Sequence, residues 1–276
     1  MKKLLLASAV LAAFSLPLTA SAQTAPAPAA APASDHTFAG NFGLFSEYRF
    51  RGISQTFKKA AIQGGFDYSH SSGVYLGNWN SNVNEGAGFP SGNLEMDFYG
   101  GWKKTWGDWG LDLGGIYYYY PGTNSSAALG LVTNNRSGQT MTGAVNNKEL
   151  YIGGSWKFLS VKYFNSMGDY FSVPGTKNSN YLDVSGTYDL GDGWGVTGHV
   201  GSLKVKNFNK GDYTDWKLGV TKDLSGWVVG ASYITTDAKG SCSAGEPYCF
   251  GNDSAAASST KNAGKSTVVL SVSKTF

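Results

Sequence analysis

The run Ser266-Thr-Val-Val-Leu-Ser-Val-Ser-Lys-Thr-Phe276, which ends the chain, decides the fold. The polar parity of this run is mostly Ser and Thr, and the other carries Val268, Leu270, Val272 and Phe276. Alternation with a period of two, rich in β-branched residues, is typical of a β-strand with one apolar and one polar face. Lys274 lies on the apolar face, where a long side chain can reach a membrane interface. The run alone fits a soluble strand or a membrane strand, so the rest of the chain must discriminate between them.

The N-terminus predicts that the chain is exported. Lys2 and Lys3 precede an apolar stretch, and Ala20-Ser-Ala22 has the small side chains of a signal-peptidase site. We therefore predict a signal peptide over residues 1–22 that is cleaved between Ala22 and Gln23.

The segment after this signal peptide is unlike the rest of the chain. Residues 23–36 are rich in Ala and Pro, which predicts an extended periplasmic tether. Residues 37–276 contain no run of about 18 apolar residues, so no transmembrane helix is expected there. If this part of the chain enters a membrane, it must do so with β-strands.

Composition favours a membrane β-barrel over a soluble β-protein. Glycine makes up 38 of 276 residues and aromatic residues 14%, while charged residues reach only 15%. The mean hydropathy of −0.22 would suit a soluble protein, but the lipid-facing and lumen-facing sides of barrel strands cancel in such an average. The net charge of +3 is too small to indicate a nucleic-acid partner. No motif indicates a metal or another cofactor, and none is predicted.

Twelve segments of residues 37–276 repeat the alternation of the C-terminal run. Two are ambiguous, because residues 74–82 mix both faces and residues 227–235 are apolar on both. An even number of strands is what a closed antiparallel barrel with both ends on one side requires. The predicted strands lie at about residues 38–51, 62–68, 74–82, 94–103, 111–119, 149–157, 161–163, 181–190, 194–200, 215–221, 227–235 and 266–276.

The connections between these strands alternate in length along the whole chain. Short links fall at residues 71–73, 105–108, 158–160, 191–193 and 223–226, and the intervening links are longer, up to residues 121–147 and 237–264. Tight periplasmic turns and longer extracellular loops are typical of outer-membrane barrels. We therefore predict an all-β fold, a transmembrane antiparallel up-and-down β-barrel of about 12 strands. Its last strand pairs with its first, which closes the sheet edge.

Several local sequences resemble a known family of bacterial barrels. The segments Glu47–Thr56, Gln63–Tyr68 and Ser72–Val83 are similar to the TorF family of porins, and shorter matches continue along most of the chain. The resemblance implies a proteobacterial outer-membrane protein with a pore and no established substrate. Chains that end on an aromatic strand also look like outer-membrane barrels in general. This likeness implies that Phe276 is the signal that the assembly machinery of that membrane reads.

The pattern and the resemblance together predict a porin-like channel for passive diffusion of small hydrophilic solutes or ions. A barrel of about 12 strands has a narrow interior, so charged side chains could line a small passage or form ion pairs that plug it. Arg49 and Arg51 are the candidates for a constriction, and the excess of inward carboxylates weakly favours cations. The parity of the strands points these candidate pore-lining residues inward: Glu47, Arg49, Arg51, Asp67, Glu95, Asp97, Lys103, Asp112, Glu149, Lys157, Lys162, Asp183, Asp215 and Lys217.

Cys242 and Cys249, the only two cysteines, lie seven positions apart in the last long connection. An exported chain reaches an oxidising compartment, so we predict a disulfide between them. The bond would pinch the loop and stabilise it by about 2–3 kcal/mol.

Two other functions stay open on the sequence alone. A closed structural or adhesive barrel that presents its loops would need no passage. An outer-membrane hydrolase would need a nucleophile with a positioned base, and the chain contains only His36, His70 and His199 as histidines. His199 alone is predicted to face the lumen, and no nucleophile motif lies beside it, so an enzyme is not expected.

Overall fold

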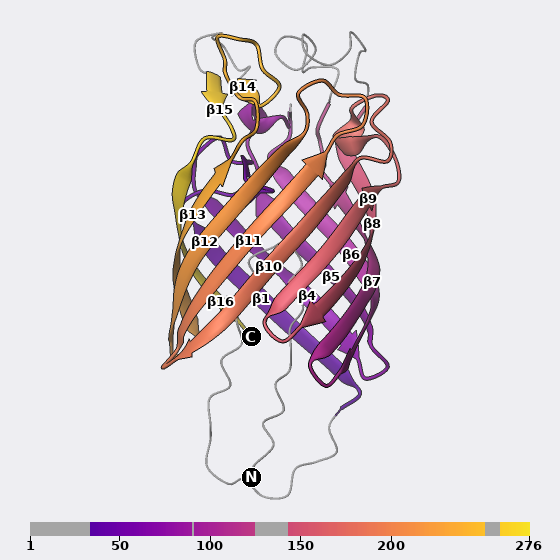
Figure 1. The fold of residues 1–276 in the computed structure, drawn as a ribbon, viewed down its shortest axis with the longest axis vertical. Coiled ribbons are helices and arrows are strands. Elements are labelled where there is room, and N and C mark those ends of the chain that lie inside the picture. Colours follow the sequence, from indigo (N-terminus) through magenta and orange to yellow (C-terminus); the bar gives the residue numbers. More distant parts are fainter. Residues whose placement is uncertain (1–33, 90, 125–142, 252–259) are drawn as a thin grey trace, which may run out of the picture.

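The computed structural model describes residues 34–89, 91–124, 143–251 and 260–276, so the predicted signal peptide and most of the predicted tether lie outside the described residues. In this part of the chain, twelve antiparallel strands form one closed barrel (Figure 1), which confirms the predicted fold class. The barrel strands are β1 (His36–Phe45), β4 (Ala61–His70), β5 (Val74–Asn82), β6 (Leu94–Trp106), β7 (Trp109–Tyr119), β8 (Asn146–Trp156), β9 (Leu159–Ser166), β10 (Asn180–Gly191), β11 (Trp194–Lys204), β12 (Tyr213–Leu224), β13 (Trp227–Thr236) and β16 (Thr267–Thr275).

The C-terminal strand closes the barrel by pairing with the first strand. In the register of β1 and β16, Asn41 faces Thr275. Phe276 extends this seam, because its N–H donates to the Gly40 carbonyl at 2.8 Å and its carbonyl accepts from the Gly40 N–H at 3.2 Å. The predicted pairing is confirmed, and the twelve barrel strands leave no free sheet edge.

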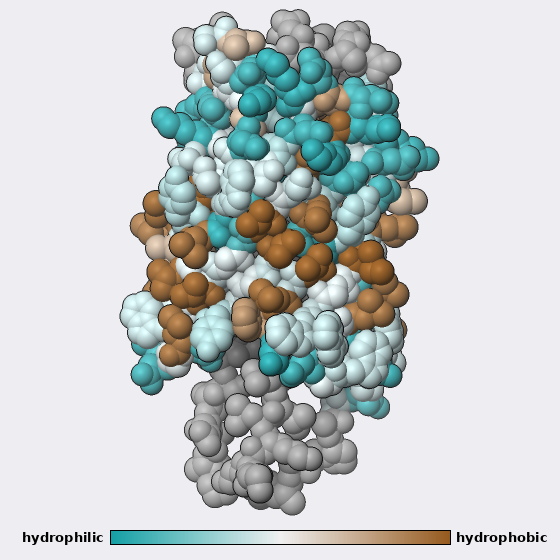
Figure 2. Space-filling model, viewed as in Figure 1, coloured by the Kyte–Doolittle hydropathy of each residue, from teal (hydrophilic) through white to brown (hydrophobic). Residues whose placement is uncertain are grey.

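The outer face of the barrel carries an apolar belt (Figure 2). Phe38, Phe66 and Leu218 are 76%, 74% and 64% exposed, as lipid-facing side chains are expected to be. Among the described residues, no helix has the length and apolarity to span a bilayer. Aromatic residues stand at strand ends beside the short turns, where a girdle at the membrane interface is expected; they are Trp106, Trp109, Trp156, Trp194 and Trp227.

The chain that follows β1 turns into the barrel instead of continuing along its wall. β1 ends before residue 46, and residues 46–60, the inner loop, fold across the lumen. This loop contains a small hairpin of β2 (Arg49–Phe50) and β3 (Ile53–Ser54). Its turn residues Arg51 and Gly52 have φ angles of 47° and 77°. Positive φ at both positions is the type I′ geometry that suits a two-residue hairpin. The prediction of one strand over residues 38–51 is therefore wrong in its second half.

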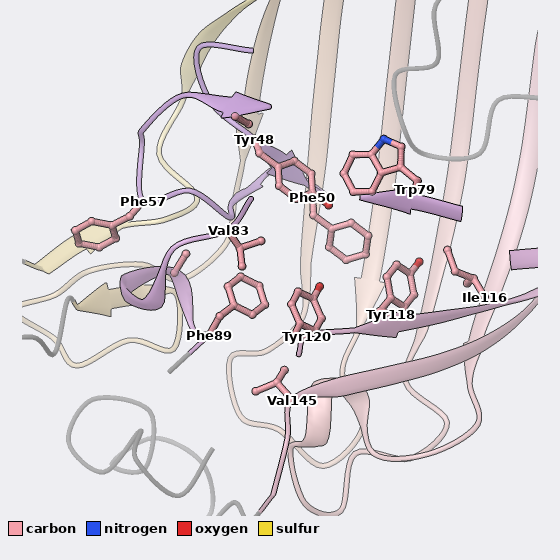
Figure 3. Packing of buried hydrophobic residues seen from close by; sticks show 12 residues of the cluster. Tyr48, Phe50, Phe57, Trp79, Val83, Phe89, Ile116, Tyr118, Tyr120 and Val145 are labelled. Carbon is pink, nitrogen blue, oxygen red and sulfur yellow. The ribbon is translucent and has the colours of Figure 1, made fainter. Parts of the chain in front are cut away.

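The alternation was misleading there because the inner loop continues the same pattern. Tyr48 and Phe50 keep the apolar parity of β1, yet they are only 5% and 8% exposed. They pack inside the barrel, Tyr48 against Trp79 and Phe50 against Tyr118 (Figure 3). Burial of these aromatic rings away from water supplies the hydrophobic gain that folds the loop inward.

The outer loops carry the remaining regular structure. Cys242 and Cys249 are bonded, which confirms the predicted disulfide. Beside it, β14 (Cys249–Gly251) pairs with β15 (Thr260–Asn262), and the Ala263 carbonyl accepts from the Ser54 N–H of the inner loop at 3.0 Å. The last outer loop therefore holds the inner loop from above. Two short 3-10 turns, η1 (Glu85–Ala87) and η3 (Tyr170–Ser172), lie in other outer loops.

Candidate functional site

The lumen beside the inner loop has two unlike halves. Tyrosine rings and ion pairs occupy the half along β4 to β9. Along β10 to β16 a cavity of about 170 Å³ remains, and it extends toward the short-turn end of the barrel, where Thr187 and Val228 line it. Its wall combines apolar side chains with hydroxyl side chains, and the hydroxyl side chains include Ser185, Thr197, Thr221, Ser232 and Ser271.

Asp112 is the centre of the network in the occupied half. The Tyr75 hydroxyl donates to its Oδ1 and the Lys162 ammonium to its Oδ2, both at 2.6 Å. Lys162 also lies over the Tyr151 ring, 4.5 Å from the centroid, and the Lys103 ammonium lies 5.3 Å from the centroid of the Tyr75 ring. These charges are therefore engaged with the wall itself.

A second contact in this half depends on a glycine. Asp67 accepts from the Tyr99 hydroxyl at 2.5 Å and from the Asn41 amide at 3.4 Å. The Tyr99 ring lies against Gly77 on the neighbouring strand, where a Cβ would come within 2.3 Å of the ring. Only a residue without a side chain leaves room for the ring at this place.

Arg51 anchors the inner loop to β8, across the barrel. Its Nη1 and Nη2 donate to Oε1 and Oε2 of Glu149 at 3.0 and 2.7 Å, and both side chains are 1% exposed. The Tyr118 hydroxyl also donates to this carboxylate at 3.2 Å, and the guanidinium lies 4.2 Å from the centroid of the Tyr181 ring. Burial alone lowers the pKa of Arg51, but the Glu149 carboxylate outweighs burial and holds that pKa well above its usual value. The loop is thus held by a charged, bidentate contact.

Arg49 ties the inner loop to itself and to the last outer loop. Its Nη2 lies 3.1 Å from Oε2 of Glu47, and its Nη1 donates to the carbonyls of Gly52 and Ala263 at 2.9 and 2.8 Å. Both charged side chains are buried. The two arginines proposed for a constriction therefore stand in ion pairs on the inner loop, not as free charges on a strand of the barrel wall.

Two further carboxylates are buried in the wall near the inner loop. Glu95 and Asp97 on β6 are both 0% exposed. The Tyr120 hydroxyl donates to Glu95 at 2.9 Å, whereas neither oxygen of Asp97 has a hydrogen-bond partner among the described residues. Neither residue lines the cavity, so both belong to the packed interior.

The wall of β10 to β12 places a histidine between two carboxylates. His199 Nδ1 lies 3.1 Å from Asp183 Oδ2, and its Nε2 lies 2.8 Å from Asp215 Oδ1. Ser185 Oγ is 3.1 Å from the same Nδ1, which brings together the residue types of a hydrolytic triad. Ser185 gives its single hydroxyl proton to Asp183, so its oxygen accepts from Nδ1, while Nε2 donates to the Asp215 carboxylate. The ring therefore donates from both nitrogens as an imidazolium. An imidazolium cannot take the proton of Ser185, so the geometry does not support a serine nucleophile.

One predicted lumen residue, Lys157, does not lie in the lumen. β8 ends at Trp156, and Lys157, with a φ of 52°, begins the two-residue turn to β9. Its side chain is half exposed, with the ammonium 4.0 Å from Asp108. The prediction was wrong because it extended the strand by one residue. The other predicted residues lie inside the barrel; Glu47, Arg49 and Arg51 stand on the inner loop, and Asp67, Glu95, Asp97, Lys103, Asp112, Glu149, Lys162, Asp183, Asp215 and Lys217 on strands.

The inward tyrosines are the functional residues that sequence reasoning did not assign. Tyr99, Tyr151 and Tyr181 share the parity of the charged lumen residues, and each one hydrogen-bonds inside the barrel. A tyrosine on the polar face of a barrel strand was the available signal. A glycine opposite it on the next strand, as Gly77 is to Tyr99 and Gly114 to Tyr151, strengthens that signal because it leaves room for the ring.

Comparison with known proteins gives one family and a set of similar folds. A sequence model of the family described as "Bacterial protein of unknown function (Gcw_chp)" matches residues 29–276. No curated protein matches the chain.

Solved structures of other barrels resemble this one. The KdgM porin in complex with disordered oligogalacturonate is 8% identical over 86% of this chain and 99% of its own, with a TM-score of 0.50. The KdgM porin by itself has a TM-score of 0.49 at 8% identity, over 86% of this chain and 98% of its own. OmpT of Vibrio cholerae has a TM-score of 0.42 at 10% identity, over 89% of this chain and 99% of its own. At such identities the likeness concerns the fold, and the resemblance to the TorF family stays a prediction.

Proposed function

The chain belongs to the Gcw_chp family of bacterial proteins, and we propose that this member is a narrow outer-membrane channel for passive diffusion of small hydrophilic solutes or ions. The observation that carries the proposal is the cavity of about 170 Å³ between the inner loop and the wall of β10 to β16, where charged and hydroxyl side chains share the lining with apolar ones. A buried space lined by hydroxyl groups retains water. The apolar belt around the same barrel supplies the lipid-facing surface that a channel needs.

The path of the solute follows from the asymmetry of the lumen. The tyrosine network occupies the half along β4 to β9, and the inner loop narrows the centre, so the passage runs along β10 to β16. Glu47 and Arg49 border this passage at the inner loop, and Asp183, Asp215 and Lys217 border it at the wall. The inner loop therefore sets the width of the channel.

We further propose the bacterial outer membrane as the location. Export would use residues 1–22 with cleavage between Ala22 and Gln23, and assembly would use the C-terminal strand that ends in Phe276. The partners are then membrane lipid at the apolar belt, the assembly machinery at Phe276 and small solutes in the lumen. The proposal includes no cofactor, no nucleic acid and no catalytic activity.

The likeness to KdgM supports a channel only through the shared fold. KdgM is a porin, and one of its structures contains a disordered oligogalacturonate. A barrel of this architecture can therefore conduct solutes. The lumen side chains of this chain, which share little sequence with KdgM, must be tested by themselves.

A closed barrel that presents its outer loops is the second candidate. The observation that favours it is the inner loop, which the bidentate contact of Arg51 with Glu149 holds across the lumen. If this loop blocks the passage as well as narrowing it, the barrel serves as a scaffold for the outer loops.

Conductance in a planar lipid bilayer discriminates between the two candidates. Refolded protein, verified as a barrel by its heat-modifiable migration on a gel, should produce stepwise ion currents. Silent bilayers with a folded barrel would refute the channel and support the closed barrel. Esterase and protease assays on the same sample test the third possibility, a hydrolase, and should show no activity above a heat-unfolded control.

A further inference from the structure

We propose that Lys217 binds the carboxylate of a small hydroxylated acid in the cavity beside the inner loop. This inference rests on the proposed function and names the chemical class of its solute. Lys217 lies on β12 and lines the cavity, and the cross-strand neighbour of its Cα on β11 is His199.

Lys217 is the exception among the four cationic side chains that line the cavity. Arg49, Arg51 and His199 each lie 2.7–3.1 Å from a carboxylate oxygen. Within the described part of the chain, no hydrogen bond and no ion pair within 4.0 Å involves the Lys217 ammonium. An ammonium on the inner wall has lost part of its hydration without a protein acceptor in return. It is therefore the group in this cavity that is most ready to take an anionic ligand.

The nearby carboxylates are not available to Lys217. Neither Asp183 nor Asp215 lies within 4.0 Å of the Lys217 ammonium as an ion pair. Both instead contact the His199 ring. Ser185 also donates to Asp183, and Tyr181 donates to Asp215 at 2.9 Å. The imidazolium and the ammonium balance the two carboxylates, so an arriving anion meets a neutral cluster with one free donor group.

This arrangement reverses the weak cation preference that the number of inward carboxylates predicts. A carboxylate that already accepts from arginine, lysine or histidine offers little to a passing cation. Glu47, Asp112 and Glu149 are all engaged in this way. The preference of the channel for cations or anions is set by the charge that is left without a partner. At the cavity that charge is positive, so anions are favoured.

The rest of the lining indicates a hydroxylated ligand. Ser185, Thr197, Thr221 and Ser232 surround the same space. The hydroxyls of Ser185 and Thr221 already donate, to Asp183 and to the Gly195 carbonyl, and can still accept. Those of Thr197 and Ser232 can donate as well as accept. A cavity of about 170 Å³ has room for on the order of ten water molecules. A sugar acid has a comparable number of non-hydrogen atoms, with one carboxylate for Lys217 and hydroxyls for the wall.

Positive charge also gathers at the outer mouth of the barrel. Lys58 stands at the exposed end of the inner loop, and Lys261 and Lys265 belong to the last outer loop. Burial, Arg49 and these two lysines lower the pKa of Lys58, which Glu47 only partly opposes. A group of neighbouring cations at a channel entrance raises the local concentration of anions and steers them inward.

Calorimetric titration of the refolded barrel in micelles tests the site directly, with D-glucuronate as the probe and D-glucose as the neutral control. Wild type should bind glucuronate and bind glucose at least tenfold more weakly. Lys217→Met should weaken glucuronate binding by about tenfold to hundredfold, the effect of losing one charge-assisted hydrogen bond. Lys222→Met is the matched control, because Lys222 lies on the same strand and contacts the Asp192 carbonyl in the turn, away from the cavity.

The outcomes separate this inference from the channel itself. Equal binding of glucuronate by wild type and Lys217→Met overturns the site, as does equal binding of glucose and glucuronate or no binding of either. Lys217→Gln provides a second variant in case the Met variant does not fold. Binding that requires Lys217 in a barrel that is silent in bilayers would keep the site and refute the channel. Ion currents without glucuronate binding would keep the channel and refute the site.

Discussion

Replacing Arg51 by alanine should release the inner loop while the barrel stays closed. The hydrogen bonds that join the barrel strands do not involve Arg51, whereas the loop depends on its contact with Glu149. The variant leaves this carboxylate buried, with only the Tyr118 hydroxyl and the Asn147 amide as donors, at 3.2 and 3.1 Å. The change should therefore act on the position of the loop and not on the fold.

The size of the effect follows from the burial of the pair. Removing one partner of a buried ion pair costs about 3–5 kcal/mol, because the other charge remains without compensation. Each 1.4 kcal/mol changes a population ratio tenfold, so the displaced state of the inner loop should become roughly 100-fold to 4,000-fold more populated. Screening by salt should change this little, since both side chains are 1% exposed.

Hydrogen exchange measures the released loop. The amides of Ser54 and Gln55 donate to the carbonyls of Ala263 and Tyr48, so they exchange only when the loop opens. In Arg51→Ala their exchange should be faster by the factor given above, and the conductance of the channel should rise. Glu149→Gln should act in the same direction.

A matched control removes an ion pair of the same kind that does not touch the inner loop. Lys162→Met breaks the contact with Asp112 and should leave exchange at Ser54 unchanged. The reasoning is refuted if Arg51→Ala exchanges at the wild-type rate. In that case the aromatic packing of Tyr48 against Trp79 would hold the loop without the ion pair.

Three further predictions concern the outer loops, the seam and the wall. Replacing Cys242 and Cys249 by serine should destabilise the last outer loop by about 2.5 kcal/mol. Amide hydrogen exchange in β14 should then be faster than in the wild type. The melting temperature of the barrel should stay the same, because neither cysteine lies in a barrel strand. Deleting Phe276 removes two hydrogen bonds to Gly40 and should lower the yield of assembled barrel in the outer membrane; an unchanged yield would contradict its role as the assembly signal. Gly77→Ala should displace the Tyr99 ring and destabilise the barrel by about 1–3 kcal/mol. Gly154→Ala, where a Cβ meets nothing nearer than 3.9 Å, should melt like wild type.

The strand pattern could be predicted because it is a local property. Each barrel strand places one face toward lipid and the other toward the lumen, so its sequence must alternate wherever the wall continues. The alternating loop lengths follow from the same architecture. The seam was predictable too, since the last strand of a closed sheet has only the first strand left to pair with.

Alternation alone could not show where a strand leaves the wall. Residues 38–50 keep one parity for apolar side chains, but Phe38 is 76% exposed and Phe50 is 8% exposed. A buried ring inside the barrel and a lipid-facing ring outside it have the same hydrophobic character. The difference lies in which atoms surround them, and that depends on residues far along the chain.

The sequence by itself thus determined a closed barrel of twelve strands, the strand that closes it and most of the side chains that face its interior. Only the tertiary structure decided which of those charges pair and which cation at the cavity is left without a carboxylate partner. Arg51 meets Glu149 across 98 positions of sequence, and His199 holds Asp183 and Asp215 on two other strands. Parity assigns a side chain to a face but not to a partner, because partners are chosen by strand register and by the path of the inner loop. Lys217 became the candidate binding group through those pairings.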